Sequence, residues 1–196
     1  MVSVAYRETV FGREARLKVQ VVPVINVLVR GLCVRPYPNH PRGCPNFFSR
    51  KTCPPAAKIF HKVFDLNEPV YAVINEYRLD KHVAKMKKAH PKWTDRQLRC
   101  VLYWQGTARK QLKGLVKEAL KEHKQYVATF CPEAMGVDIT KTLAAAGVQL
   151  EWPPVVTVRQ VALLGKLRRW RCLGSPVDPC TTDDPCVVCE ERRMEK

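Results

Sequence analysis

The chain has 196 residues, 46% of them hydrophobic, which is enough for one folded domain with a sizeable core. Its formal net charge of +16 attracts polyanions and makes nucleic acid the default electrostatic partner. The first residues carry charges of both signs and no clean apolar segment, which argues against a signal peptide. The most apolar stretch, 19–34, contains Pro23, Asn26 and Arg30 and does not suit a membrane span. We therefore expect a cytoplasmic protein with no membrane partner.

The first third of the chain predicts strands and one helix around a proline-rich loop. Residues 16–34 are rich in β-branched side chains and predict a strand, or a bent pair broken at Pro23, that delivers Cys33 at its end. A helix is expected after Pro54 and Pro55, because proline suits the first turn of a helix. A second strand is predicted over 70–79.

The remainder predicts helices alternating with strands. Asp80 is expected to cap a short basic helix that ends near His90, and a long helix is predicted from Thr94 to about His123. Asp138 is expected to cap a helix over 139–146, with Gly147 as its C-cap. Short strands are expected over 126–131 and 155–164.

This order of elements favours an α/β layered fold. We predict a single domain over 1–165 with a small, mostly parallel or mixed sheet flanked by helices. A short basic, cysteine-rich C-terminal tail is predicted over 166–196.

Three cysteines stand in the proline-rich loop, at positions 33, 44 and 53, and Cys44 and Cys53 are each followed directly by proline. Because proline fixes φ and donates no backbone hydrogen bond, the loop is expected to be stiff and to hold its thiols in fixed directions. Nine cysteines without a secretory signal favour metal binding or redox chemistry over a disulfide framework. The alternative is a proline-rich surface loop whose cysteines are incidental.

Two segments carry a family resemblance. The run from Cys44 to Cys53-Pro-Pro, followed later by Cys131-Pro-Glu-Ala-Met-Gly-Val-Asp, resembles the uncharacterised predicted metal-binding family known as domain of unknown function 2284. The likeness covers about residues 33–164 and implies a metal site. In this sequence the first loop is spaced more widely than in the family, and Cys131 stands alone where the family tends to carry several cysteines. That family has no assigned reaction, so the resemblance supplies none.

The cysteine spacing narrows the choice of metal. Ten residues separate Cys33 from Cys44 and eight separate Cys44 from Cys53, which matches neither a zinc ribbon nor a standard ferredoxin run. Thiolates select zinc or iron-sulfur centres, and we expect a 4Fe-4S cluster on Cys33, Cys44 and Cys53, with Cys131 as the preferred fourth ligand and His40 as an alternative. Four cysteines would give a closed cluster for electron transfer or structure, whereas three would leave one iron open for sulfur chemistry.

The tail contains a second cysteine group. Four thiols within 18 residues could enclose a zinc ion, either instead of the cluster or as a second site: Cys172, Cys180, Cys186 and Cys189. A disordered tail with spare cysteines is the alternative.

Two basic segments are candidates for nucleic-acid binding. On the long helix, Leu98, Leu102, Ala108, Leu112, Leu115 and Ala119 are expected to face the core, and a basic stripe recurs at steps of three and four residues: Lys110, Lys113, Lys117, Lys121 and Lys124. The other segment is Arg168, Arg169, Trp170 and Arg171, in which Trp170 either stacks on a base or covers the edge of the domain. The stripe could equally be a solvated helix face.

The sequence thus supports two hypotheses. The first is a metal-binding protein that holds an iron-sulfur cluster for redox or sulfur chemistry. The alternative is a zinc-stabilised module that binds RNA or DNA without catalysis.

Overall fold

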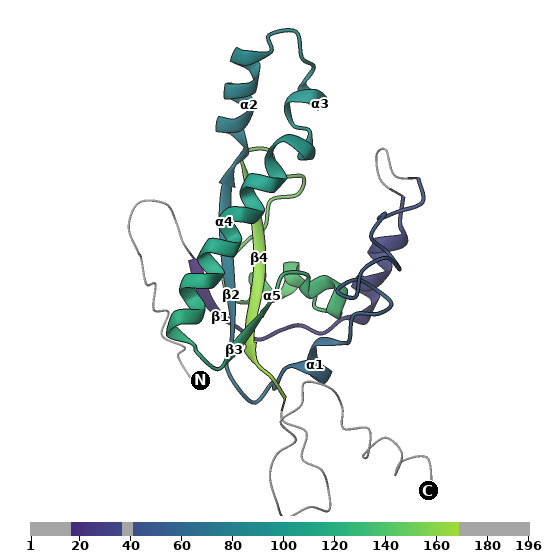
Figure 1. Cartoon of the computed structure of the whole chain (residues 1–196), viewed down its shortest axis with the longest axis vertical. Coiled ribbons are helices and arrows are strands. Elements are labelled where there is room, and N and C mark those ends of the chain that lie inside the picture. Colours follow the sequence, from purple (N-terminus) through teal and green to yellow (C-terminus); the bar gives the residue numbers. More distant parts are fainter. Residues whose placement is uncertain (1–16, 37–40, 169–196) are drawn as a thin grey trace, which may run out of the picture.

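A computed structural model describes residues 17–36 and 41–168 (Figure 1). At its centre lies a four-stranded sheet with the strand order β1-β2-β4-β3. The strands are β1 (Leu17–Val21), β2 (Val70–Arg78), β3 (Tyr126–Thr129) and β4 (Thr157–Lys166). The predicted strands over 70–79, 126–131 and 155–164 are therefore present with small shifts at their ends.

The expectation of a mostly parallel or mixed sheet is wrong, because every neighbouring pair of strands is antiparallel. β2 and β3 do run parallel to each other, but β4 lies between them and pairs with both. The alternation of strands and helices suggested direct parallel crossovers. It could not show that the last strand inserts between two earlier ones.

Helices and short 3-10 turns connect the strands. They are η1 (Val27–Val34), α1 (Phe60–Val63), α2 (Leu79–Ala89), α3 (Asp95–Leu98), α4 (Val101–Glu122), η2 (Pro132–Met135) and α5 (Ile139–Ala145). Asp138 caps α5 as predicted, by accepting from the backbone N–H of Lys141 at 3.0 Å. The predicted strand over 16–34 is half right, because only β1 joins the sheet as a strand and Cys33 lies on η1.

The predicted long helix is in fact two helices. Thr94 and Gln97 form a capping box that starts α3, but the chain leaves helical geometry at Cys100 before α4 begins. Trp104 and Val116 join Ala108, Leu112 and Ala119 as the buried residues of α4, whereas Leu102, expected in the core, is 84% exposed.

Both faces of the sheet are covered. On one face, Val73, Ala162 and Leu164 pack against α4. On the other face, Ile74 and Leu163 pack with a second set of apolar residues that includes Phe60, Phe64, Val137 and Leu143. Because successive residues of a strand point to opposite faces, the neighbours Leu163 and Leu164 serve different cores and both are fully buried.

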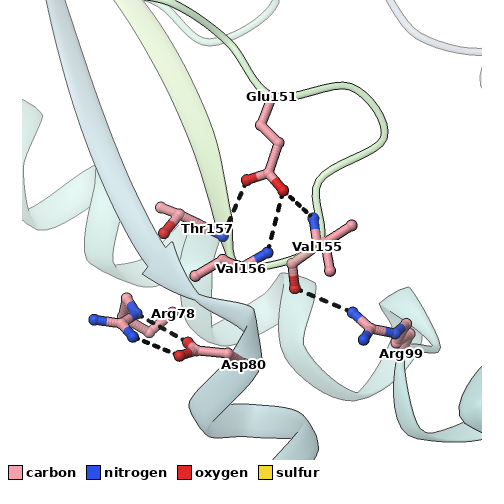
Figure 2. Close-up of polar contacts among 7 residues, drawn as sticks. All are labelled: Arg78, Asp80, Arg99, Glu151, Val155, Val156 and Thr157. Atoms are coloured by element: carbon pink, nitrogen blue, oxygen red, sulfur yellow. Dashed lines mark hydrogen bonds and ion pairs between the residues drawn. The ribbon is translucent and has the colours of Figure 1, made fainter.

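Residues 79–100, which comprise α2, α3 and the turn between them, form a projection that we call the arm. In Figure 1 the arm extends beyond the ends of β2 and β4. Its base is fixed to the loop before β4, since Arg99 donates to the carbonyl of Val155 at 3.1 Å (Figure 2). The carboxylate of Glu151 orders the same loop by accepting from the N–H groups of Val155 and Val156 at 2.8 and 3.3 Å, and these bonds hold the pKa of Glu151 below its ordinary value. Asp80, expected to cap α2, instead pairs with Arg78.

Within the described residues, no helix combines the length and the apolar character that a membrane crossing requires.

Gly165 of β4 generates a stability prediction. A Cβ atom at this position would lie 2.9 Å from Cδ1 of Phe64, whose ring is buried and stacks on Phe60 with centroids 4.4 Å apart. We expect Gly165→Ala to lower the free energy of unfolding by about 1–3 kcal/mol, because the ring has little room to move. Urea denaturation measures the change.

The matched control is Gly114→Ala on α4, where a Cβ would meet nothing within 4 Å. It should raise the free energy of unfolding by about 0.5–1 kcal/mol, because alanine is the better helix former. Equal effects of the two substitutions would contradict the packing argument at Gly165.

Candidate functional site

The cysteine segments of the two halves of the chain are brought together by backbone pairing. Asn26 donates its N–H to the carbonyl of Gly136 at 2.7 Å, and Ile25 forms a β-bridge with Val137. η1 begins directly after residues 25–26, and η2 ends directly before residues 136–137. The pairing of these two segments therefore packs η1 against η2. It thereby sets Cys33, near the end of η1, beside the segment that begins at Cys131.

Gly43 holds the second cysteine against the first. The N–H of Cys44 donates to the carbonyl of Cys33 at 2.7 Å, and Gly43 has a φ of +80°. A Cβ on Gly43 would lie 2.5 Å from that carbonyl oxygen and 2.9 Å from the backbone of Val34. Glycine is therefore required here by both the left-handed backbone and the close approach of two chain segments.

The loop between Cys44 and Cys53 is a chain of tight turns. Phe47 donates its N–H to the carbonyl of Cys44 at 3.1 Å, Phe48 donates to the carbonyl of Pro54 at 3.0 Å, and Cys53 donates to that of Arg50 at 2.9 Å. These bonds satisfy the backbone without a helix or strand, as the prolines of the loop require. The sequence prediction of an irregular loop is correct for the described part of it.

Arg30 ties this loop to η1. Its guanidinium donates to the carbonyl of Pro55 at 3.1 Å and to that of Ala57 at 2.9 Å. The segment that follows Cys53 is thereby fixed to the same 3-10 helix that carries Cys33. The positive charge of Arg30 also favours the thiolate form of Cys33.

The cysteine thiols are electrostatically coupled. Burial raises the pKa of the Cys33 thiol, and the nearby thiols of Cys44 and Cys53 raise it further. Burial likewise raises the pKa of the Cys131 thiol, and the charge of Cys53 raises it further. Neighbouring thiolates oppose each other's ionisation, which adds to the effect of burial on the pKa of Cys33 and of Cys131. We call Cys33, Cys44, Cys53 and Cys131 the thiol cluster.

The thiol cluster has the donor chemistry of a soft-metal site. Its four cysteines are free thiols, all partly buried, and sulfur ligands select zinc or iron-sulfur centres. In the described part of the chain, however, no three His, Cys, Asp or Glu side chains are already close enough to hold a metal ion. The donor types therefore fit the expected metal, and the side chains would have to draw together around it.

The structure does not describe the other predicted ligands. His40 and the tail cysteines Cys172, Cys180, Cys186 and Cys189 fall outside the described residues. Cys100, the remaining described cysteine, lies in the arm at the N-cap of α4.

The predicted basic stripe lies on the solvent side of α4. Lys110, Lys113, Lys117 and Lys121 are exposed and lie opposite the buried face, and Lys124 follows just beyond the end of the helix. Lys121 pairs with Glu118 at 3.0 Å, while the other four form no ion pair with any residue that the structure describes. The stripe is thus a continuous positive surface.

The second basic segment is only partly described. Arg168 donates to the carbonyl of His61 at 3.3 Å, while Arg169, Trp170 and Arg171 lie outside the described residues. The prediction for this segment therefore stays a prediction.

Sequence reasoning missed Arg30 and Gly43. The signal for Gly43 was available, because a glycine directly before a cysteine in a proline-rich loop indicates a close backbone approach. Arg30 gave no signal, since its partners are carbonyl groups more than twenty residues away that any sequence could supply.

No protein-family model, curated protein or solved structure matches this chain. The resemblance to the uncharacterised metal-binding family stays a prediction, and it rests on the cysteine and proline motifs quoted above.

Gly43→Ala should loosen the thiol cluster without removing a thiol. The added methyl group would push the loop away from the carbonyl of Cys33, so we expect Cys33 and Cys44 to react several-fold faster with a thiol reagent such as dithionitrobenzoate. Rates are measured for the unfolded and native proteins in parallel. Gly31→Ala on η1 is the matched control, since a Cβ there meets nothing within 4 Å and should leave the rates unchanged.

Proposed function

We propose that this protein binds a thiolate-ligated metal centre through the thiol cluster, with an iron-sulfur cluster as the preferred centre. The observation that supports the proposal is that contacts between distant segments bring the parts of the chain that carry four free cysteines, up to 98 residues apart, into one region of the fold. These contacts are the approach of Gly43 to residues 33 and 34, the hydrogen bonds of the Arg30 side chain, and the backbone pairing of residues 24–26 with 136–138.

Charge neutralisation supplies the driving force in this proposal. Protons are favoured on the thiols of Cys33 and Cys131 because burial and neighbouring thiols oppose ionisation. A bound cation reverses that balance, since coordination deprotonates a thiol and removes the repulsion between thiolates. Thiols kept in this state require a reducing compartment, which is why we place the protein in the cytoplasm.

Removing one thiol of the loop tests the proposal. We expect Cys44→Ser and Cys53→Ser each to abolish metal binding, because a hydroxyl is a poor ligand for a soft metal. The measurement is iron, sulfide and zinc per chain, together with the visible absorption spectrum, in protein purified without oxygen.

Cys100→Ser is the matched control, because Cys100 is a partly buried cysteine that lies in the arm. It should retain the metal content of the unmodified chain. Full metal content in both Cys44→Ser and Cys53→Ser would overturn the proposal. Zinc alone, without iron or sulfide, would keep a thiolate site and exclude the cluster.

A second candidate function is the binding of nucleic acid by the basic stripe of α4. The specific observation in its favour is that the stripe occupies the face opposite the packing residues, so its lysines are free of any structural task in the core. A net charge of +16 supports the same partner.

The double substitution Lys113→Glu/Lys117→Glu tests this function. We expect weaker binding to a labelled single-stranded oligonucleotide. The slope of log K against log salt concentration should also become shallower, by about 0.7 for each phosphate contact that is lost. The comparison is Lys58→Glu/Lys62→Glu, which changes the net charge equally at exposed positions near α1. Equal loss of binding in the two variants would show a general charge effect and contradict a specific role for α4.

A further inference from the structure

A stack of three aromatic rings lies at the surface where the arm meets α4. The rings of His90 and Trp93 are stacked with centroids 4.0 Å apart and planes 8° apart, and those of Trp93 and Tyr103 with centroids 5.1 Å apart and planes 27° apart. His90 is exposed and Tyr103 is 52% exposed, so both ends of the stack have contact with solvent. We call these three residues the ring stack. It contributes to none of the three apolar clusters of the described structure.

The ring stack lies in a strongly basic surface. Residues 79–99 contain seven lysines and arginines against two aspartates. Both aspartates are already paired, Asp80 with Arg78 and Asp95 with Arg99. Five exposed or half-exposed lysines form no ion pair within the described residues, namely Lys81, Lys85, Lys87, Lys88 and Lys92. The field around the rings is therefore positive.

Helical geometry aligns Tyr103 with the basic stripe. Tyr103, Lys110 and Lys117 are seven residues apart, and residues at this spacing lie on the same face of a helix. At 1.5 Å per residue the line from Tyr103 to Lys121 is about 27 Å long. An aromatic platform and a row of ammonium groups thus form one continuous surface along α4.

Two glycines flatten this surface. Gly106 and Gly114 lie three or four residues from members of the same line, and a Cβ at either position would meet nothing within 4 Å. Each glycine costs about 1 kcal/mol of helix stability relative to alanine, and nothing in the described fold requires it. Glycine does permit the close approach of a ligand to the helix backbone.

From these observations we infer that the ring stack and the solvent face of α4 form a binding surface for single-stranded nucleic acid. One base extends the stack on Tyr103, and the following phosphates lie along Lys110, Lys113 and Lys117. Single strands fit this chemistry because their bases are available for stacking on aromatic rings, whereas those of a duplex are not. The inference rests on the second function proposed above and adds the stacking site to it.

The fixed base of the arm supports the inference. Arg99 of the arm is bonded to Val155, and the indole Nε1 of Trp104 donates to the carbonyl of Arg99 at 3.1 Å. Trp104 in turn stacks on Tyr77 of β2, with centroids 5.6 Å apart. The rings are therefore held in place before a ligand binds, which reduces the entropy lost on binding.

Tyr103→Ala tests the stacking site in the full chain. Binding of a labelled mixed-sequence 12-nucleotide single strand is measured by fluorescence anisotropy at several salt concentrations. We expect affinity to fall by roughly fivefold to a hundredfold, the effect of losing one stacked base, with an unchanged salt slope because no charge is removed. Tyr103→Phe should bind as the unmodified chain does.

Leu102→Ala is the matched control, because Leu102 is the preceding residue on the same helix and is 84% exposed. It should leave affinity unchanged. Loss of affinity in Leu102→Ala equal to that in Tyr103→Ala would overturn the inference, since a general apolar contact would then explain both. Tighter binding of a duplex of the same sequence, or binding to anionic lipid vesicles with none to the oligonucleotide, would also overturn it.

The experiments distinguish failure of the stacking site from failure of nucleic-acid binding by the basic stripe. If Tyr103→Ala binds normally while Lys113→Glu/Lys117→Glu does not, the stacking site is wrong and the basic stripe stands. If the unmodified chain binds no oligonucleotide at low salt, both are wrong.

Discussion

The antiparallel pairing of β2 with β4 is the contact on which the rest of the described structure depends. It joins Tyr71–Arg78 to Thr157–Leu164, and it places fully buried residues such as Ile74 and Leu163 on one face and Ala162 and Leu164 on the other. Burial of such side chains is the main favourable term in folding. Because these two strands bury side chains on both faces, helices from different parts of the chain are held in one assembly.

The thiol cluster depends on this pairing indirectly, through the two outer strands β1 and β3. β3 is anchored to β4, and the chain leaves β3 directly into Cys131 and η2. β1 is anchored to β2, and the chain leaves β1 toward η1 and Cys33. The sheet thus delivers two distant cysteine segments to a common place, where the pairing of residues 24–26 with 136–138 completes the approach. In Figure 1 this region lies to one side of the sheet, away from the arm.

The arm depends on the opposite ends of the same two strands. β2 continues without a loop into α2. At the base of the arm, Arg99 donates a hydrogen bond to Val155 in the loop before β4. The arm leaves the sheet at Arg78 and Thr157, whereas the segments that carry the thiol cluster leave it after Val21 and Thr129.

Several local features followed from the sequence because neighbouring residues decide them. The Asp138 cap of α5 and the irregular proline loop needed only short-range interactions, and the lysine spacing on α4 placed its basic stripe correctly. The strand over 70–79 was predictable for the same reason, since its β-branched residues and the turn before it are adjacent in the chain.

Other features were decided only by the tertiary structure. The position of β4 between β2 and β3 follows from which apolar faces fit together, and no local pattern encodes that choice. The break at Cys100 divides the predicted long helix into α3 and α4, and packing on the sheet decides which residues of α4 are buried: Trp104 stacks on Tyr77 of β2, while Leu102 is exposed. The residue types in the chain set the kinds of chemistry available, namely thiols, lysines and aromatic rings. Only long-range packing decided which of them meet, because the contacts that join them span tens of residues along the chain.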